Sequence, residues 1–308
     1  MSPEKPNKSP RDNSHPASRD ADGQRIAKLL ARAGVASRRE IERMIAEGRV
    51  AIDGQAIDTP ATILRSLKGV TVDGNPVEAA APARLFLYHK PSGVLVTERD
   101  PNGRPTIYDR LPKDLPRLVP VGRLDLNTEG LLLLTTDGEL KRQLELPATG
   151  VERAYRARAY GTVTQAQLED LIEGVEIEGV RYGSIDANLE RRTGANVWIE
   201  MILTEGKNRE VRRVLEYLGL KVSRLIRTRY GPFILADLPV GGIGEVRQHD
   251  IVAFRKDPRR MPPAEPAKFR ESRGRDAAAD RAGAHSRNVG RRVFLLGHHY
   301  RPGQGIRS

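Results

Sequence analysis

Cysteine is absent from the 308 residues, and aromatic side chains are scarce at 5%, with a single tryptophan. The absence of cysteine excludes disulfides, thiolate metal sites and cysteine nucleophiles. No stretch approaches the ~20 consecutive apolar residues that a membrane-spanning helix needs. Residues 1–20 contain no apolar segment of the kind found in secretory signals. We therefore expect a cytoplasmic protein without a membrane partner.

Basic residues are in excess, with 52 Lys and Arg against 40 Asp and Glu and a formal charge of +12. Such a surplus favours a polyanionic partner such as nucleic acid. Residues 257–308 hold 12 basic and 5 acidic residues and have almost no apolar periodicity. They predict a disordered basic tail, which either solvates the chain or contacts RNA. Residues 1–23 predict a disordered leader, so folded structure is expected over 24–256.

The first part of that range predicts two short helices followed by short strands. Apolar residues over 26–33 recur on one helical face. Ser37 and Glu40 form an S-x-x-E capping box at the start of the second helix. Short apolar strands are expected over 50–52 and 70–72, each followed by an Asp-Gly turn.

This helix pair carries an excess of positive charge, with seven basic and three acidic residues over 25–49. Such cations either solvate the helix faces or contact phosphates without reading sequence. The segment QRIAKLLARAGVASRREIERMIAEGRVAIDG resembles an S4 RNA-binding domain, over residues 24 to about 72. The resemblance implies an RNA-binding role for exposed cations of the pair, namely Arg25, Lys28, Arg38, Arg39 and Arg43.

A small-residue linker over 79–83 separates this S4-like domain, residues 24–83 with the linker, from a second domain over 84–256. The second domain is rich in apolar and β-branched runs and has no regular βαβ alternation. Strands are expected over 85–90, 94–97, 118–121, 131–134, 155–160, 197–203, 222–226 and 233–238, and helices over 139–146, 164–174 and 209–218. This pattern predicts an α+β fold with a mixed, mainly antiparallel sheet flanked by helices.

One carboxylate stands out in the segment GRLDLNTEGLLLLT, where Asp125 lies in a polar loop directly before an apolar strand. Three roles fit such a carboxylate: it could cap a turn, begin a calcium-binding loop or act as a nucleophile. A calcium loop needs a glutamate at its twelfth position, and that position is Thr136 here. The residues alone therefore argue against calcium but leave the turn cap and the nucleophile open.

Several motifs resemble those of one enzyme family. The segment GRLDLNTEGLLLLTTDG is similar to the active-site signature of pseudouridine synthases, in the branch that acts on ribosomal RNA and carries an S4 domain. Further motifs of that family are matched in its own order by HKPSGVLVTERDPNGRPTIYD, VERAYRARAYG and LTEGKNREVRRVLEYLGLKVSRLIRTRYGPF. The resemblance implies an enzyme that isomerises uridine to pseudouridine in RNA, with no cofactor and no metal.

The resemblance also implies roles for three catalytic residues. Asp125 is the expected nucleophile, which attacks either C6 of the base or C1′ of the ribose. Tyr155 is expected to stack on the target base and to help remove the C5 proton. Arg212 is the expected ion-pair partner of Asp125, with Arg209 and Lys207 as alternatives.

Other cations are expected to contact RNA. Lys90 and Arg123 are assigned to phosphates, as are Lys207 and Arg209. Residues 205–229 hold eight basic and three acidic residues, consistent with an RNA-facing cleft. Lys207 stands where relatives often have arginine, which puts a bidentate contact in doubt at this position.

Within the branch, the chain looks most like the members that act on 23S RNA, with 16S RNA as the alternative. Ribosome-assembly intermediates are further candidate partners, and we expect a monomer. A non-catalytic RNA chaperone or assembly factor would explain the S4-like domain and the tail equally well. It would leave Asp125, Tyr155 and the basic cluster over 209–213 without a role.

Overall fold

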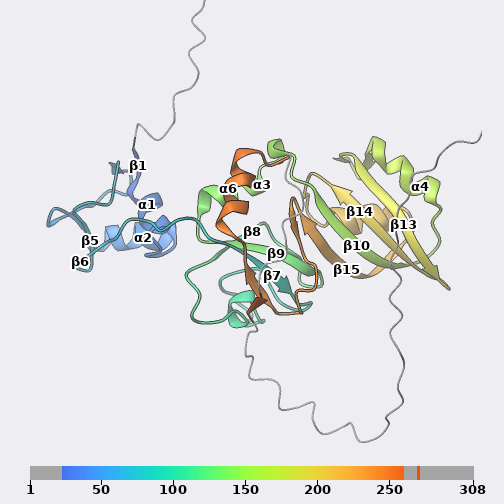
Figure 1. The fold of residues 1–308 in the computed structure, drawn as a ribbon, viewed down its shortest axis with the longest axis horizontal. Helices are drawn as coiled ribbons and strands as arrows, with labels where there is room; N and C mark the ends of the chain where they lie inside the picture. Colours follow the sequence, from blue (N-terminus) through green and yellow to red (C-terminus); the bar gives the residue numbers. More distant parts are fainter. Residues whose placement is uncertain (1–22, 260–268, 271–308) are drawn as a thin grey trace, which may run out of the picture. The chain divides into compact units, whose positions relative to one another are not determined.

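The computed structural model describes residues 23–259 and 269–270. Most of the predicted leader (1–23) and most of the predicted basic tail (257–308) therefore lie outside the described residues. What is described comprises an N-terminal part of short helices and strands, followed by a larger part built on a mixed sheet (Figure 1). Within these ranges, no helix has the length and apolar character needed to cross a membrane.

The N-terminal part contains the two helices expected from the sequence, α1 (Ile26–Arg32) and α2 (Arg38–Ala46). The Ser37 hydroxyl oxygen accepts the backbone N–H of Glu40 at 3.2 Å, which is the Ser37 half of the predicted capping box, whereas the Glu40 carboxylate pairs with Arg43. The strands are β1 (Gln24–Arg25), β2 (Val50–Ile52), β3 (Gln55–Ala56), β4 (Ile63–Leu64), β5 (Val70–Val72) and β6 (Asn75–Pro76). Buried apolar side chains of both helices pack with those of β2 and β5, so this part has its own hydrophobic core.

The larger part is organised by one mixed sheet. Its strands are β7 (Leu85–Lys90), β8 (Val119–Val121), β9 (Glu129–Thr135), β10 (Arg153–Tyr160), β13 (Ile185–Thr193), β14 (Asn196–Leu203), β15 (Lys221–Tyr230), β16 (Phe233–Ile234), β17 (Ile243–Glu245) and β18 (Phe269–Arg270). The main order is β13-β14-β10-β15-β9-β7-β17-β18, with β16 beside β15 and β8 beside β9. Only β9 and β15 run parallel among the described strand pairs, and this confirms the predicted mixed, mainly antiparallel sheet.

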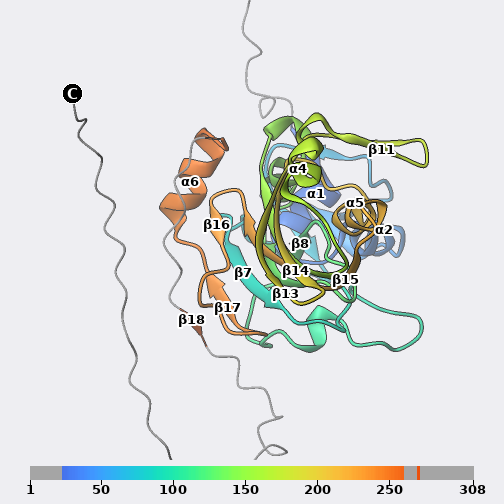
Figure 2. The ribbon, with the colours of Figure 1, turned by 90° about the vertical axis from the view of Figure 1, so that its right-hand side faces the viewer.

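Helices cover the sheet in two groups. The helices are α3 (Gly138–Glu145), α4 (Gln165–Glu169), α5 (Glu210–Tyr217) and α6 (Gln248–Lys256), with short 3-10 turns η1 (Ile107–Asp109), η2 (Pro147–Thr149) and η3 (Asp170–Glu173). Buried side chains of α4 and α5 share one core with β10, β14 and β15, whereas those of α3 and α6 share another with β7 and β9. Figure 2 shows the strong curvature of the β13–β14–β15 region, with α4 and α5 beside it.

Some sequence predictions for this part were wrong. The segment 94–97 forms no strand. Its only β-type pairing among the described residues is an isolated bridge between Leu95 and Thr106. The helix expected over 164–174 is α4 followed by η3, and the strand expected over 233–238 ends at Ile234. The sequence pattern also missed β13, α6 and the small hairpin of β11 (Val175–Ile177) and β12 (Val180–Tyr182).

The predicted apolar strand is the central element of the sheet. Leu131 and Leu133 in β9 pack into the core that contains α3 and α6, whereas Leu132 and Leu134 pack into a second core on the opposite face. Both faces of β9 are therefore buried, which explains its continuous apolar run. The loop 122–128 leads directly into β9, so its C-terminal end is anchored by a strand that is buried on both faces.

Gly130 lies where β9 meets β15, paired in register with Arg227. Its φ is +104°, and a Cβ atom built there would lie 2.3 Å from the Arg227 carbonyl oxygen and 2.7 Å from its nitrogen. Both contacts are with backbone, which has little freedom to move. Only glycine fits this crossing without displacing one of the two parallel strands.

We predict that Gly130→Ala lowers the free energy of unfolding by at least about 2 kcal/mol, because it combines backbone strain with a steric clash. Urea unfolding followed by circular dichroism measures the change. Gly138→Ala is the matched control, since a Cβ at Gly138 meets nothing within 4 Å. Equal stabilities of the two variants would contradict this account of the crossing.

Candidate active site

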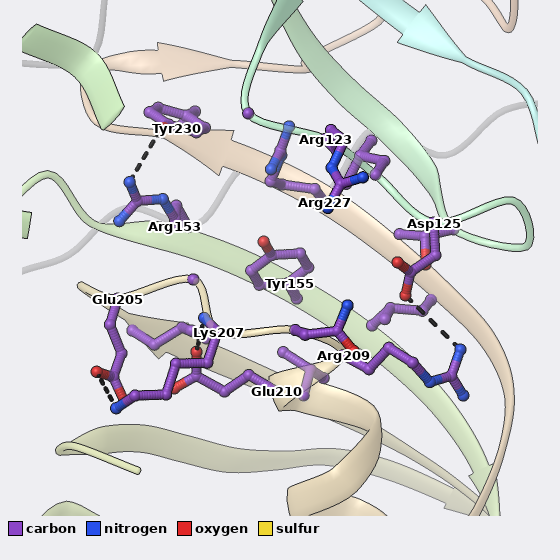
Figure 3. Close-up of a pocket in the computed structure, with 18 of the residues that line it drawn as sticks. Arg123, Asp125, Arg153, Tyr155, Glu205, Lys207, Arg209, Glu210, Arg227 and Tyr230 are labelled. Carbon is purple, nitrogen blue, oxygen red and sulfur yellow. Dashed lines mark hydrogen bonds and ion pairs between the residues drawn. The ribbon is translucent and has the colours of Figure 1, made fainter. Parts of the chain in front are cut away.

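A pocket of about 620 Å³ opens at the junction of β9, β10 and β15 (Figure 3). Three segments supply most of its lining: the loop before β9, the inward face of β10 and β15, and the turn that leads into α5. The pocket brings together six of the predicted site residues, namely Arg123, Asp125, Tyr155, Lys207, Arg209 and Arg212. The sequence alone could not show that these three segments meet.

Asp125 lies in the loop between β8 and β9, and its side chain is 39% exposed. A turn closes on the loop, because the Thr128 N–H donates to the Asp125 carbonyl oxygen at 3.0 Å. The Gly93 N–H donates to the next carbonyl oxygen, that of Leu126, at 2.8 Å. These bonds use the backbone of the loop, so the Asp125 carboxylate is left at the wall of the pocket (Figure 3).

Lys90 was expected to contact a phosphate, but its side chain is fully buried and cannot do so in this structure. Its Nζ donates to the carbonyl oxygens of Pro91, Asp125, Leu126 and Thr128, at 3.0, 3.2, 3.3 and 2.8 Å. Burial lowers the pKa of Lys90 to about 8, against the opposing effect of nearby carboxylates. A lysine at the end of a buried strand thus holds the backbone of the Asp125 loop.

Arg212 holds the loop carbonyl that Lys90 does not reach. It is 8% exposed on α5, where its Nη2 donates to the Asn127 carbonyl oxygen at 2.9 Å and its Nη1 to that of Val222 at 3.4 Å. Burial lowers the pKa of Arg212, as does the nearby Arg209, whereas the charge of Asp125 raises it. Arg212 therefore lies within the electrostatic reach of Asp125.

The direct ion pair of Asp125, however, is with Arg209, which the sequence analysis gave as an alternative. Arg209 Nη1 lies 3.8 Å from Asp125 Oδ2. Arg212 faces the loop backbone instead, because α5 begins one residue after Arg209 and directs Arg212 into the protein interior. Arg209 has a φ of +53°, a left-handed conformation that is unusual for arginine and common at functional sites.

Tyr155 lies at the centre of the pocket view in Figure 3 and is half-buried. It is on β10, directly opposite Arg227 on β15, so both side chains lie on the same face of the sheet. Arg227 is one of the basic residues over 205–229, and no individual role was predicted for it. The sequence did offer a signal for Arg227. It lies two residues after the apolar Leu225 in a strand, so both side chains are on the same, buried face of the sheet.

The turn before α5 is held by a group of charged residues. Lys207 Nζ donates to Glu205 Oε2 at 2.6 Å and to the Arg181 carbonyl oxygen at 2.7 Å, and the Lys207 backbone N–H donates to Glu210 Oε2 at 2.8 Å. Glu210 is 3% exposed, and burial raises its pKa to about 7, an effect that the neighbouring Glu205 reinforces. Lys207 thus already has polar partners within the protein.

The remaining RNA-binding candidates are surface residues. Arg123 is exposed at the edge of the pocket. In the N-terminal part, Lys28 is partly exposed, and the others lie exposed on or beside α1 and α2: Arg25, Arg38, Arg39 and Arg43. Arg43 forms ion pairs within its own helix, to Glu40 and Glu47. Exposure leaves these positions accessible to a phosphate backbone.

Two family models match the chain: that of the S4 domain over residues 24–68 and that of RNA pseudouridylate synthase over residues 84–217. An uncharacterised RNA pseudouridine synthase of Rickettsia felis is 43% identical over 223 residues, which cover 72% of this chain and 96% of the relative. Ribosomal large subunit pseudouridine synthase B of Pasteurella multocida is 45% identical, over 73% of this chain and 67% of the relative.

A solved structure is similar as well. The crystal structure of a pseudouridylate synthase has a TM-score of 0.52 and 25% sequence identity, and the match covers 74% of this chain and 98% of that chain. The family models, the relatives and the fold agree with the resemblance found in the motifs. The chain therefore belongs to the RNA pseudouridine synthase family, as a member with an N-terminal S4 domain, and it is an enzyme that isomerises uridine in RNA.

Proposed function

We propose that this enzyme converts a uridine of ribosomal RNA, preferably 23S RNA, to pseudouridine with Asp125 as nucleophile. The observation that carries the proposal is the pocket in which the Asp125 carboxylate and Tyr155 lie together. The relatives named ribosomal large subunit pseudouridine synthase B support the choice of 23S RNA, and 16S RNA is the alternative. Membership of an enzyme family argues against the alternative of a non-catalytic assembly factor.

Asp125 is suited to covalent catalysis by its position. Its carboxylate lies on the pocket wall, where a substrate can reach it, and Arg209 Nη1 lies 3.8 Å from its Oδ2 and helps to orient it. The loop backbone is fixed by Lys90 and Arg212, so little motion has to be restrained when the substrate binds. Attack at C6 of the base and attack at C1′ of the ribose are both compatible with this arrangement.

The position of Tyr155 in the pocket supports the roles proposed from its motif. A half-buried ring in the pocket offers a face on which the target base stacks. Its hydroxyl is the group that we propose to assist removal of the C5 proton. The reaction breaks the N1–C1′ bond and forms a C5–C1′ bond, while C5 loses a proton and N1 gains one, so the product is an isomer of the substrate.

RNA has to deliver a single nucleotide into the pocket. Extruding a uridine from a folded RNA costs a few kcal/mol, and phosphate contacts offset this cost. Arg123 and Arg209 lie exposed at the pocket and are the candidates for these contacts, together with Lys207 and the cations of the S4 domain. Ribosomal RNA or an assembly intermediate as substrate implies a cytoplasmic enzyme, and we expect it to act as a monomer.

Of the predictions that follow from the site and its proposed function, the first concerns substrate and nucleophile. Unmodified 23S and 16S RNA are incubated with the protein, and pseudouridine is mapped by carbodiimide-blocked primer extension. We expect a new stop in 23S RNA, and a loss of at least about 10⁴-fold in rate for Asp125→Ala because the nucleophile is removed. Asp170→Asn, which changes an exposed carboxylate outside the pocket, is the control and should retain full activity.

A stop in 16S RNA alone would favour the alternative substrate. No stop in either RNA would contradict the proposed substrate class, and a stop that survives Asp125→Ala would exclude this residue as the nucleophile.

The second prediction concerns Lys90 as a positioning residue. Lys90→Met removes the ammonium, so the Asp125 and Thr128 carbonyl oxygens lose the hydrogen bonds that it donates to them. We expect kcat to fall by about 10- to 100-fold with little change in KM, because Asp125 loses its alignment. Lys113→Met changes an exposed lysine and is the control. If Lys90→Met raised KM and left kcat unchanged, Lys90 would be a substrate-binding residue instead.

The third prediction follows from Glu210, whose pKa burial raises from 4.5 to about 7. Between these two values the folded state binds more protons than the unfolded state, so the free energy of unfolding falls as pH rises. Glu210→Gln removes this dependence and keeps an acceptor for the Lys207 N–H.

We expect Glu210→Gln to be more stable than the natural protein at pH 8, on the order of 2 kcal/mol, with the difference shrinking towards pH 4. Thermal or denaturant unfolding across this range measures the difference. Glu216→Gln, an exposed change on the same helix, serves as control. Stability curves of constant separation would show that Glu210 does not titrate with folding.

A further inference from the structure

Arg227 is a buried cation in the wall of the pocket to which the mechanism above gives no task. It lies on β15 opposite Tyr155, is 3% exposed and lines the same pocket as Asp125 (Figure 3). A buried guanidinium is normally retained only where its N–H groups find partners. The partners of Arg227 therefore decide whether it has a structural role alone.

Only part of this guanidinium is occupied within the described residues. Its Nε donates to the Leu131 carbonyl oxygen at 2.7 Å, which fixes the side chain against β9. Its Cζ lies 5.0 Å from the centre of the Tyr230 ring, a cation–π contact that fixes the plane of the group. Its Nη2, in contrast, is buried and has no hydrogen-bond partner. The group is thus oriented by two contacts while a charged donor remains unused.

The neighbouring Arg153 provides a comparison. Like Arg227, it makes a cation–π contact with Tyr230, and its Cζ lies 4.7 Å from the centre of the ring. Its nitrogens, however, donate to the carbonyl oxygens of Val151 and Thr204 and to the Tyr230 hydroxyl. Arg153 is therefore accounted for as a structural residue, and Arg227 is not.

The unused donor belongs to a wider pattern in the pocket. Other buried side-chain atoms without a hydrogen-bond partner in the described chain include Nε of Arg212 and Oγ1 of Thr128. Both residues line the pocket together with Arg227. Unpaired buried polar atoms are rare in folded proteins, and each needs a specific explanation.

Two parts of a nucleotide could meet Arg227: a phosphate or a carbonyl oxygen of the base. Phosphates belong to the RNA backbone and remain near the pocket entrance, where the exposed Arg123 and Arg209 lie. The base is the part of an extruded nucleotide that enters furthest, and Arg227 lies opposite the tyrosine expected to stack on it. Burial therefore favours the base as the partner of Arg227.

We propose that Arg227 donates a hydrogen bond from its guanidinium to a carbonyl oxygen of the target uracil and stabilises the negative charge that develops there. The proposal rests on the proposed placement of the target uridine against Asp125. If Asp125 attacks C1′, the N1–C1′ electron pair stays on the uracil and spreads to O2 and O4. If Asp125 attacks C6, the electron pair of the C5–C6 bond moves towards O4. In either route a fixed, desolvated guanidinium stabilises the charged intermediate more than the neutral base.

The experiment compares the natural protein with Arg227→Gln and Arg227→Lys on the same RNA substrate, with enzyme in excess. We expect Arg227→Gln to lower the single-turnover rate by about 10²- to 10³-fold while the Kd for RNA changes by less than about threefold. Arg227→Lys, which keeps the charge, should recover part of the rate. Arg229→Gln is the matched control on the same strand, since Arg229 pairs with Glu152 at 2.9 Å and does not line the pocket.

Substrate analogues separate the base from the phosphate. RNA with 4-thiouridine or 2-thiouridine at the target position weakens acceptance at O4 or O2. We expect one analogue to slow the natural protein and to have little further effect on Arg227→Gln, because both changes remove the same hydrogen bond. Thermal unfolding checks that each variant is folded, and if Arg227→Gln is not, the same comparison is made with Arg227→Lys.

The outcomes distinguish the inference from the proposed function. An unimpaired rate for Arg227→Gln, or analogue effects that simply add to those of the variant, would contradict the inference alone. A loss confined to RNA affinity would assign Arg227 to a phosphate and would also overturn it. If the natural protein formed no pseudouridine in ribosomal RNA, the proposed function would fail, and the inference would fail with it.

Discussion

The structure of the pocket depends on one buried ammonium group. Lys90, at the end of β7, donates to the carbonyl oxygens of Asp125, Leu126 and Thr128, and Arg212 on α5 takes the remaining carbonyl, that of Asn127. These two cations bind the carbonyl oxygens of residues 125–128. The Asp125 carboxylate lies at the pocket wall. Reactivity here follows from a fixed backbone, because a carboxylate held in position needs little reorganisation to attack.

The second constraint is the parallel contact between β9 and β15, which joins the two halves of the sheet. Gly130 allows the strands to approach closely enough for Arg227 to lie opposite it. This crossing brings the loop before β9 next to the turn before α5, although about 80 residues of sequence separate them. Asp125 and Arg209 meet for this reason, and four cations of the segment 205–229 line the pocket, namely Lys207, Arg209, Arg212 and Arg227.

Local signals in the sequence predicted much of the fold. The Ser37 cap, the buried strand at 131–134 and the mixed sheet were expected from short-range patterns, and the structure confirms them. Predictions failed where distant contacts decide the outcome. Lys90 looked like a surface cation, because nothing near it in sequence reveals the four carbonyl groups that surround it. Arg212 was the expected ion-pair partner of Asp125, whereas the structure has Arg209 in that place. The cause is similar, since the turn before α5 sets which arginine faces the Asp125 carboxylate.

Catalysis depends most on Asp125 as the nucleophile, and a trapped intermediate tests this role directly. In RNA that carries 5-fluorouridine at the target position, C5 holds fluorine in place of the proton that must leave, so the reaction cannot be completed normally. The enzyme is incubated with this RNA and digested with protease and nuclease, and tandem mass spectrometry locates the attached nucleotide. We predict attachment at Asp125. Attachment at any other residue would contradict the account.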